Sequence, residues 1–329
     1  MTAKMLKRVV VAIDGLTGHQ RQRIVSQLGD WAVADFVPEK PADWRHSLLD
    51  AEVVFGWPPP LALEESQIRF FQLPSSGYDQ YMTQVLTSKP GFCLANARGV
   101  AAVAVAEHCL SMMFAFTRQV SLHTRQQERH QWRRANHYSL LAGSTVAIVG
   151  LGAIGRALAQ RCHALGMRVL AVRRGSDAVS FIAESYALDD LHTALRHARH
   201  VVLTIAALPR SEPLFGAAEF HAMSSESCFY NMSRGSLVDQ EALEVALRDG
   251  KLAGAGLDVF AQEPLPGTSG LWDLENVLVS PHAGGRFDGE VHGLIDLFLH
   301  NIQQYRSTRQ MANLVIDNHD RPCSTESSL

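Results

Sequence analysis

Three ionisable side chains of different chemical types each follow a separate apolar run in the second half of the chain. Arg234 comes after CFYNM, Glu263 after GLDVF, and His282 after VLVS. If these runs are parallel strands of one sheet, their carboxyl ends lie along one edge, where open α/β sheets bind their ligands. The pattern therefore predicts that a guanidinium, a carboxylate and an imidazole converge on one cleft.

These three groups together suit the interconversion of a 2-keto acid and a 2-hydroxy acid. A guanidinium can bind the substrate carboxylate through two parallel hydrogen bonds and polarise the adjacent keto oxygen, which is the role expected of Arg234. A histidine titrates near neutral pH, so His282 can donate a proton to the forming alkoxide or accept one from the hydroxyl. A carboxylate on the far ring nitrogen fixes the tautomer and favours the imidazolium, which is the role expected of Glu263.

Each of these residues taken alone is explained more simply as a surface or loop charge, and their joint placement after successive strands favours the functional interpretation. Asp258, inside GLDVF, is a further candidate for binding the carboxamide of a nicotinamide, with an ordinary turn aspartate as the alternative. The fifteen histidines form no HExxH pattern, so no metal site is predicted.

A glycine-rich turn upstream predicts the hydride donor for this reaction. Gly150, Gly152 and Gly155 stand in GLGAIG, between an apolar run and a helical stretch. In this motif the first glycine permits a tight turn, the second lets the backbone approach a pyrophosphate, and the third allows close helix packing. We predict a dinucleotide site that also includes Ala153 and Ile154 at the start of the helix, and a merely tight turn is the weaker alternative.

The residues after the next strand predict which dinucleotide is used. The motif places an acidic residue about 20 positions on, where it binds the ribose 2′-hydroxyl of NAD. Here the run VLAV ends on Arg173 and Arg174, and the first carboxylate nearby is Asp177. A guanidinium suits the 2′-phosphate of NADP, so NADP is the expected cofactor. NAD is kept as a second cofactor, because an arginine can also stack on adenine, and a solvated surface charge is the alternative explanation.

Strand-like and helical stretches alternate along the chain, which predicts an α/β fold with doubly wound parallel sheets. The apolar stretch Val100–Thr117 contains Glu107 and His108 near its middle, so we expect a buried helix and no membrane span. The following SLHTRQQERHQWRRANHYS is too polar for a core. We expect it to form an exposed arm or an interface segment.

Composition and charge exclude several classes of function. The length of 329 residues suggests two domains. A net charge of −3 and basic residues spread along the chain argue against general nucleic-acid binding. Five widely spaced cysteines without a CxxC pair or a secretory signal predict a reducing cytoplasm. The polar stretch Asp320–Leu329 is expected to be a loose tail.

Four motifs, GLGAIG, NMSRGSLVDQEAL, AGAGLDVFAQEP and NVLVSPHAGG, resemble those of the D-isomer-specific 2-hydroxyacid dehydrogenases and stand in the same order. The resemblance covers nearly the whole chain. It implies two Rossmann-like domains, with a dinucleotide-binding domain at residues 100–286 inserted into a flavodoxin-like substrate domain at residues 1–99 and 287–329. It also implies that Arg234 binds substrate, His282 is the acid/base and Glu263 is its partner.

The resemblance also implies which residues bind the substrate and how the protein assembles. The turn after RFFQL, with Ser75, Ser76 and Gly77, would provide backbone donors for the substrate carboxylate, and an ordinary Ser-Gly turn is equally consistent with the residues. The family dimerises through its cofactor domain, so a homodimer is expected.

Differences from the motifs of related enzymes narrow the choice of substrate. Formate dehydrogenases carry glutamine where this chain has Glu263, which disfavours formate. Phosphoglycerate dehydrogenases usually prefer NAD and often carry a C-terminal regulatory domain, whereas this chain has arginine at the selecting position and a short tail. We expect a glyoxylate or hydroxypyruvate reductase. The alternatives are another 2-hydroxyacid dehydrogenase, such as one for phosphoglycerate, and a non-catalytic NAD(P)H-sensing interaction protein of the corepressor type.

Overall fold

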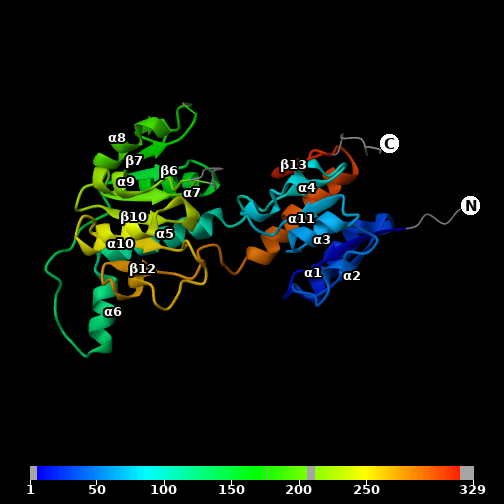
Figure 1. Ribbon diagram of the computed structural model, residues 1–329, viewed down its shortest axis with the longest axis horizontal. Helices are drawn as coiled ribbons and strands as arrows, with labels where there is room; N and C mark the ends of the chain where they lie inside the picture. Colours follow the sequence, from blue (N-terminus) through cyan, green and yellow to red (C-terminus); the bar gives the residue numbers. More distant parts are fainter. Residues whose placement is uncertain (1–5, 176, 206–211, 319–329) are drawn as a thin grey trace, which may run out of the picture. The chain divides into compact units, whose positions relative to one another are not determined.

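The computed structural model describes residues 6–175, 177–205 and 212–318 (Figure 1). The expected loose tail, Asp320–Leu329, lies outside the described residues. The chain divides into two compact units, a terminal unit of residues 1–100 and 288–329 and an inserted unit of residues 101–287. The domain boundaries expected from the sequence differ from these by one residue at each of the two points where the chain passes between units.

The terminal unit contains a six-stranded sheet in the order β13-β5-β4-β3-β1-β2. The five strands β1 to β5 are parallel in the flavodoxin-like order 2-1-3-4-5. The last strand, β13, runs antiparallel to β5 and returns the C-terminal part of the chain to this sheet. The strand bounds are β1 Lys7–Val11, β2 Ala32–Phe36, β3 Ala51–Phe55, β4 Phe70–Gln72, β5 Cys93–Ala95 and β13 Leu314–Asp317.

Both faces of this sheet are covered by helices, so most of the buried positions in its central strands are apolar. Along β1, Val9 and Val11 belong to the core under α1 and α11, whereas Val10 faces the core under α3 and α4. Phe298 of α11 stacks on Phe55 of β3 with ring centroids 4.5 Å apart. The helix bounds are α1 Gly18–Leu28, α2 Trp44–Ser47, α3 Pro60–Glu65, α4 Gln84–Ser88 and α11 Glu290–Arg306.

The inserted unit contains a seven-stranded parallel sheet in the order β12-β11-β10-β9-β6-β7-β8. Counted within the unit, this is the Rossmann order 3-2-1-4-5-6 with a seventh strand added beside the sixth. The strand bounds are β6 Thr145–Val149, β7 Arg168–Val172, β8 Glu184–Tyr186, β9 His200–Leu203, β10 Cys228–Asn231, β11 Gly254–Leu257 and β12 Val277–Val279.

Successive residues of β6 again face opposite layers of helices. Val146 and Ile148 lie in the core with α5 and α7, and Ala147 and Val149 lie in the core with α8, α9 and α10. This is the doubly wound α/β arrangement predicted from the alternating strand and helix patterns. The helix bounds are α5 Ala102–Thr117, α6 Val120–Glu128, α7 Ala153–Ala164, α8 Leu191–Arg196, α9 Ala217–Ala222 and α10 Gln240–Arg248.

One face of the long apolar helix α5 is buried, whereas Val103 and Phe114 are exposed, so the prediction of a buried helix holds for that face only. Ala106, Cys109 and Met113 are fully buried against α7 and the sheet. Glu107 points to the surface, where it accepts a hydrogen bond of 3.2 Å from Arg161 of α7. In the described part of the chain, no helix has the length and apolar character needed to cross a membrane.

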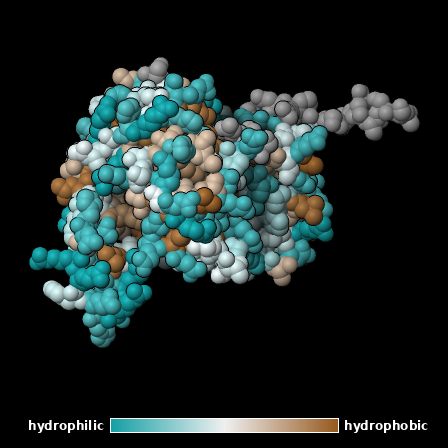
Figure 2. Space-filling model, turned by 60° about the vertical axis from the view of Figure 1, so that its left-hand side comes forward, coloured by the Kyte–Doolittle hydropathy of each residue, from teal (hydrophilic) through white to brown (hydrophobic). Residues whose placement is uncertain are grey.

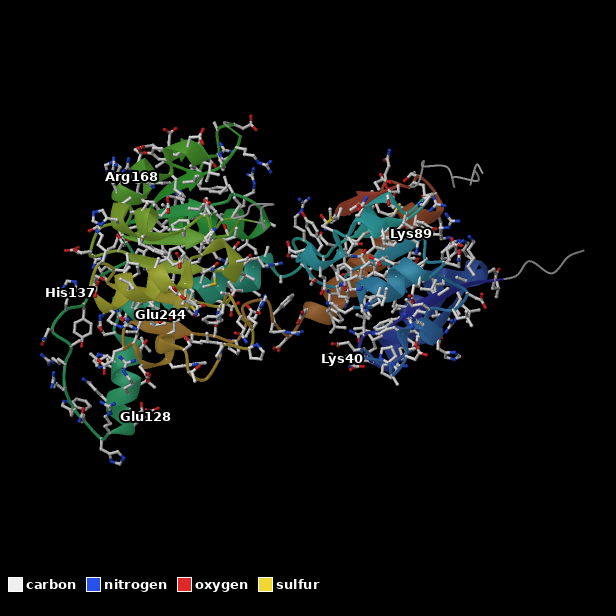
Figure 3. All side chains as sticks on the ribbon, in the orientation of Figure 1. Lys40, Lys89, Glu128, His137, Arg168 and Glu244 are labelled. Carbon is white, nitrogen blue, oxygen red and sulfur yellow. The ribbon has the colours of Figure 1, made fainter. Side chains whose placement is uncertain are left out.

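The polar segment after α5 is exposed. It forms α6 and an extended stretch over residues 129–140, which project away from the sheet of the inserted unit (Figure 1). Figure 2 shows that this projection is mostly hydrophilic. Figure 3 shows Glu128 at the end of α6 and His137 on the stretch that follows. Trp132 within it is fully exposed, which is unusual for so large an aromatic side chain.

Candidate active site

Glu263 and His282 are in direct contact at the carboxyl ends of β11 and β12. The distance from His282 Nδ1 to Glu263 Oε2 is 2.8 Å. The other carboxylate oxygen of Glu263 accepts a hydrogen bond of 3.0 Å from the backbone N–H of Phe260, which fixes its orientation. The His282 side chain is 51% exposed. Because Nδ1 is held by the carboxylate, Nε2 is the ring nitrogen that can exchange a proton with a substrate.

His282 is held in an uncommon backbone conformation. Its φ of 52° lies in the left-handed region, which non-glycine residues rarely adopt. Its N–H donates to the carbonyl of Asp258 at 2.9 Å. The Asp258 side chain accepts from the backbone N–H groups of Ala283 at 2.9 Å and Gly284 at 3.0 Å. Asp258, directly after β11, therefore holds the backbone of His282 and of the two residues that follow it.

Arg234 follows β10 and belongs to a segment that packs on the Glu263 loop. Asn231 fixes this turn, since its amide donates to the Arg234 carbonyl at 3.0 Å and accepts from the Ser233 N–H at 3.1 Å. A Cβ added at Gly235 would lie 1.8 Å from the carbonyl oxygen of Phe260. Only glycine allows this approach. The structure thus brings Glu263 and His282 into contact. It also packs Gly235, the residue after Arg234, against Phe260, whose N–H orients Glu263.

The glycine-rich turn between β6 and α7 has a shape that fits a dinucleotide. Gly150 has a φ of 102°, and a Cβ there would lie 2.8 Å from the Cα of Ile205. A Cβ at Gly155 would lie 2.0 Å from the Gly150 carbonyl oxygen, so this glycine is needed for close packing of α7. Gly152 is the N-cap of α7, and a Cβ there would meet nothing within 4 Å. The open backbone at Gly152 and the helix N-terminus can therefore accept a pyrophosphate.

The two arginines after β7 differ in their contacts. Arg173 Nε donates to Ser185 Oγ at 3.2 Å, and its guanidinium also donates to the Asp177 carbonyl. Arg174 is exposed, and its guanidinium makes no hydrogen bond or ion pair within the described part of the chain. Arg174 is therefore the arginine whose charge is available for a phosphate group, whereas Arg173 braces the turn.

The predicted substrate turn lies in the terminal unit, after β4. Ser75 Oγ donates to the Gly77 carbonyl at 2.9 Å, and the Ala97 N–H donates to the Ser75 carbonyl at 2.9 Å. The buried Asn96, directly after β5, donates from its side-chain amide to the Ser76 carbonyl at 2.8 Å. The carbonyls of Ser75, Ser76 and Gly77 are thus occupied, and the turn can present N–H donors.

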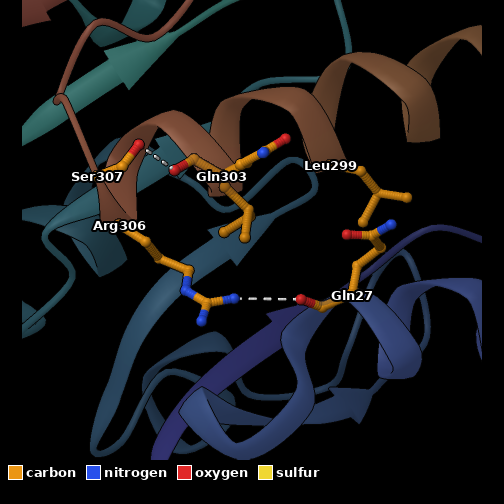
Figure 4. A pocket seen from close by; sticks show the side chains of 6 residues that line it. Gln27, Leu299, Gln303, Arg306 and Ser307 are labelled. Carbon is orange, nitrogen blue, oxygen red and sulfur yellow. Dashed lines mark hydrogen bonds between the residues drawn. The ribbon is translucent and has the colours of Figure 1, made fainter.

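A surface cavity of about 410 Å³ lies elsewhere in the terminal unit, between the C-terminal ends of α1 and α11 (Figure 4). Arg306 donates to the Gln27 carbonyl at 3.2 Å across it, and Ser307 donates to the Gln303 carbonyl at 2.9 Å. The end of α1 lies at the amino-terminal edge of the parallel strands. This cavity is therefore separate from the strand ends that carry Ser75 to Gly77.

Sequence reasoning missed several groups that hold these candidates in place. Asn96 and Ser280 are the first polar residues after β5 and β12, so the same strand-end rule that selected His282 could have found them. The Phe260 N–H is a backbone group and gives no signal in the side-chain pattern. His108, which contacts Ser280, lies in an apolar helix far away in sequence, and its contact could not be anticipated.

Comparison with known proteins identifies the family. The family model described as "D-isomer specific 2-hydroxyacid dehydrogenase, NAD binding domain" matches residues 110–284, which is just over half of the chain. The chain is similar to a glyoxylate reductase of Korarchaeum cryptofilum, with 30% identity over 275 residues that cover 81% of this chain and 79% of the relative. It is also similar to glyoxylate/hydroxypyruvate reductase B of Salmonella schwarzengrund, with 35% identity over 226 residues, 67% of this chain and 69% of the relative.

Among solved structures, the fold is similar to that of an NADPH-dependent glyoxylate/hydroxypyruvate reductase of Sinorhizobium meliloti. The TM-score is 0.78 at 22% identity, over 94% of this chain and 98% of the other. This likeness concerns the fold alone, and it agrees with the two Rossmann-like sheets described above. The chain therefore belongs to the D-isomer-specific 2-hydroxyacid dehydrogenase family of NAD(P)-dependent oxidoreductases.

Proposed function

We propose that this protein is an NADP-preferring reductase of small 2-keto acids, with glyoxylate or hydroxypyruvate as substrate. The observation that carries the proposal is the 2.8 Å contact between His282 and Glu263 at the carboxyl edge of the sheet. The first strand of the same sheet, β6, leads into the glycine-rich turn that fits a dinucleotide. The names of two relatives, glyoxylate reductase and glyoxylate/hydroxypyruvate reductase B, support this choice of substrate.

In the proposed reaction the three ionisable residues act on one carbonyl group. The nicotinamide, when bound, supplies the hydride. Arg234 holds the substrate carboxylate and polarises the keto oxygen, and His282 donates a proton from Nε2 to that oxygen as the hydroxyl forms. Glu263, which already contacts Nδ1, stabilises the imidazolium form of His282 before the transfer. Oxidation of a 2-hydroxy acid uses the same groups with His282 as the base.

The cofactor site in this proposal is formed by the turn between β6 and α7 and by the end of β7. Gly150, Gly152 and Gly155, with Ala153 and Ile154, receive the pyrophosphate, because the N-terminus of α7 offers unpaired N–H groups. The exposed guanidinium of Arg174 binds the 2′-phosphate of NADP, and Arg173 keeps the turn in place. NAD is accepted less well because it leaves the Arg174 charge without a partner.

Two further roles in binding are proposed for groups that hold their loops. Ser75, Ser76 and Gly77 present backbone N–H groups to the substrate carboxylate. Asp258 binds the nicotinamide carboxamide through Oδ2, which accepts from the Gly284 N–H, whereas Oδ1 already accepts from the Ala283 N–H and the Ser280 hydroxyl.

We also propose that two copies of the chain form a homodimer through the inserted unit. The projecting α6 and the stretch 129–140 expose Trp132 fully, together with Val120 and Leu140. Exposed large apolar side chains on one projecting segment are typical of residues that a partner covers. The four cysteines in the described part of the chain are buried and free, which supports the expected reducing cytoplasm.

Steady-state kinetics with purified protein test the function directly. We expect NADPH oxidation with glyoxylate and hydroxypyruvate, weaker turnover with pyruvate and longer 2-keto acids, and a higher kcat/KM with NADPH than with NADH. A clear preference for NADH would contradict the cofactor assignment. Tight NADPH binding without turnover of any keto acid would favour a sensing protein over an enzyme.

A further inference from the structure

A partly buried chain of hydrogen bonds connects α5 to the segment that carries His282. His108 Nε2 lies 2.8 Å from Ser280 Oγ, and Ser280 Oγ donates to Asp258 Oδ1 at 2.6 Å. His108 Nε2 is also 3.5 Å from the same carboxylate oxygen. The Asp258 side chain is only 5% exposed, so these partners take the place of water around its charge.

The direction of each hydrogen bond in this chain follows from the groups involved. The Asp258 carboxylate already accepts two backbone N–H groups, and an ionised carboxylate can only accept. The Ser280 hydroxyl therefore donates its single hydrogen to Asp258. Its oxygen then accepts from His108, which places a hydrogen on Nε2 of the His108 ring. The chain thus runs from the imidazole through the hydroxyl to the carboxylate.

The same chain of bonds fixes the backbone on both sides of His282. Ser280 precedes the histidine by two residues, and the N–H groups bound by Asp258 belong to the two residues that follow it. The His108 ring also packs on Gly284, where an added Cβ would lie 3.1 Å from its Cδ2 atom. A left-handed non-glycine residue persists only where its surroundings hold it. His108, Ser280 and Asp258 supply that hold.

We propose that His108 is a positioning residue for the acid/base His282. It acts through Ser280 and Asp258 to keep the His282 ring oriented with Nδ1 against Glu263, and it touches neither substrate nor cofactor. This inference rests on the proposed function, since it assigns His108 a part in the same proton transfer. The role explains why a polar ring in this mostly apolar helix has its Nε2 turned to the sheet edge.

Three variants of the full chain test this role by kinetics. His108→Phe keeps the ring volume and removes the donor, His108→Gln keeps a donor, and Ser280→Ala removes the middle of the chain. We expect His108→Phe and Ser280→Ala each to lower kcat about 10-fold with little change in the Kd for NADPH, because a displaced catalytic group slows the chemical step. His108→Gln should recover most of the loss. The double variant should be no slower than Ser280→Ala, because both residues act through one path.

Glu107→Gln is the matched control, because Glu107 is the neighbouring residue on α5 and pairs with Arg161 at the surface. It should leave kcat unchanged. Full kcat in both His108→Phe and Ser280→Ala would overturn the proposal, as would losses that multiply in the double variant. If His108→Phe does not fold, as judged by its melting curve, the smaller change Ser280→Ala still decides the outcome.

A second readout does not depend on turnover. In protein labelled with ¹⁵N-histidine, the Nδ1 resonance of His282, assigned by its loss in His282→Gln, reports the hydrogen bond to Glu263. We expect this resonance to move towards that of an unbonded ring in His108→Phe and to stay in place in Glu107→Gln. An unmoved resonance in His108→Phe overturns the positioning role. Undiminished turnover in His282→Gln would instead overturn the proposed function, so the two failures are distinguishable.

Discussion

The two units use the same architecture and place different groups at the carboxyl ends of their strands. In the terminal unit, the turn after β4 is held by hydrogen bonds from Asn96 and from Ser75 within the turn, and it offers neutral backbone donors. In the inserted unit, the ends of β11 and β12 carry Asp258, Glu263 and His282, which are hydrogen-bonded into one network. A parallel sheet thus provides a common frame, and the loops determine which chemical groups stand at its carboxyl edge.

The same contrast extends to the buried polar side chains. Among the described residues, those buried in the terminal unit are neutral amides, namely Gln72, Asn96, Asn301 and Asn318. The inserted unit buries His200 and Asp258 as well. We therefore expect changes in the terminal unit to affect substrate affinity, and changes in the inserted unit to affect catalysis, cofactor choice and the pH dependence of stability.

The largest effect is expected at His282. His282→Ala should lower kcat on the order of 1,000-fold, because it removes the only group proposed to transfer the proton. The Kd for NADPH, measured by fluorescence titration, should stay within a factor of about two of the wild type, since His282 lies outside the pyrophosphate turn. A variant with normal turnover would mean that another residue transfers the proton.

Gly235→Ala should damage both stability and catalysis. Its Cβ would lie 1.8 Å from the Phe260 carbonyl oxygen, so the segments that carry Arg234 and Glu263 must move apart. We expect the free energy of unfolding to fall by about 3 kcal/mol, measured by urea denaturation. Gly267→Ala is the control, because a Cβ there meets nothing within 4 Å and no positive φ is required. Equal stability of the two variants would contradict the close packing at Gly235.

Acid sensitivity of the inserted unit should depend on His200. Burial, assisted by the charge of Arg199, lowers the pKa of His200 to about 4 from its ordinary value of 6.5. Below pH 6.5 His200 is mostly protonated in the unfolded chain, whereas in the folded chain it becomes protonated only near pH 4. The free energy of unfolding therefore falls with decreasing pH over this window, by about 2 kcal/mol between pH 6.5 and pH 5.

His200→Phe should remove this part of the pH dependence, measured as the free energy of unfolding at the two pH values. His19→Phe, at an exposed position on α1 of the terminal unit, is the matched control and should keep the wild-type dependence. If both variants keep the full loss at pH 5, His200 is not the source of the acid sensitivity.

Cofactor choice should depend more on Arg174 than on Arg173. Arg174→Ala should raise the KM for NADPH about 10-fold and leave that for NADH almost unchanged, because a charge-assisted hydrogen bond to the phosphate is lost. Arg173→Ala, which removes the contact with Ser185, should have a smaller and less selective effect. The reverse order of the two variants would show that Arg173 binds the phosphate.

The smallest effect is expected in the terminal unit. Asn96→Ala removes the amide that holds the Ser76 carbonyl, so the backbone donors of this turn should lose their alignment. We expect the KM for the keto acid to rise about 5-fold while kcat stays near the wild-type value. A fall in kcat without a change in KM would contradict the division of roles between the two units.

Local patterns were enough to predict the α/β class, the glycine-rich turn and the three ionisable residues at strand ends. They did not reveal β13, because LVID is a short apolar run whose antiparallel pairing with β5 depends on the chain returning from α11. They also did not reveal the contact of His108 with Ser280, since the two residues are separated by 172 positions. Side-chain pairs between distant elements follow from packing, which a single sequence does not display.

The most direct test of the account is a crystal structure of the protein with NADP⁺ and oxamate, a non-reacting analogue of a 2-keto acid. We predict that the oxamate carboxylate contacts Arg234 and that its amide carbonyl oxygen lies within hydrogen-bond distance of His282 Nε2, with Nδ1 still against Glu263. Oxamate bound away from either Arg234 or His282 would contradict the proposal that these residues act on one carbonyl group.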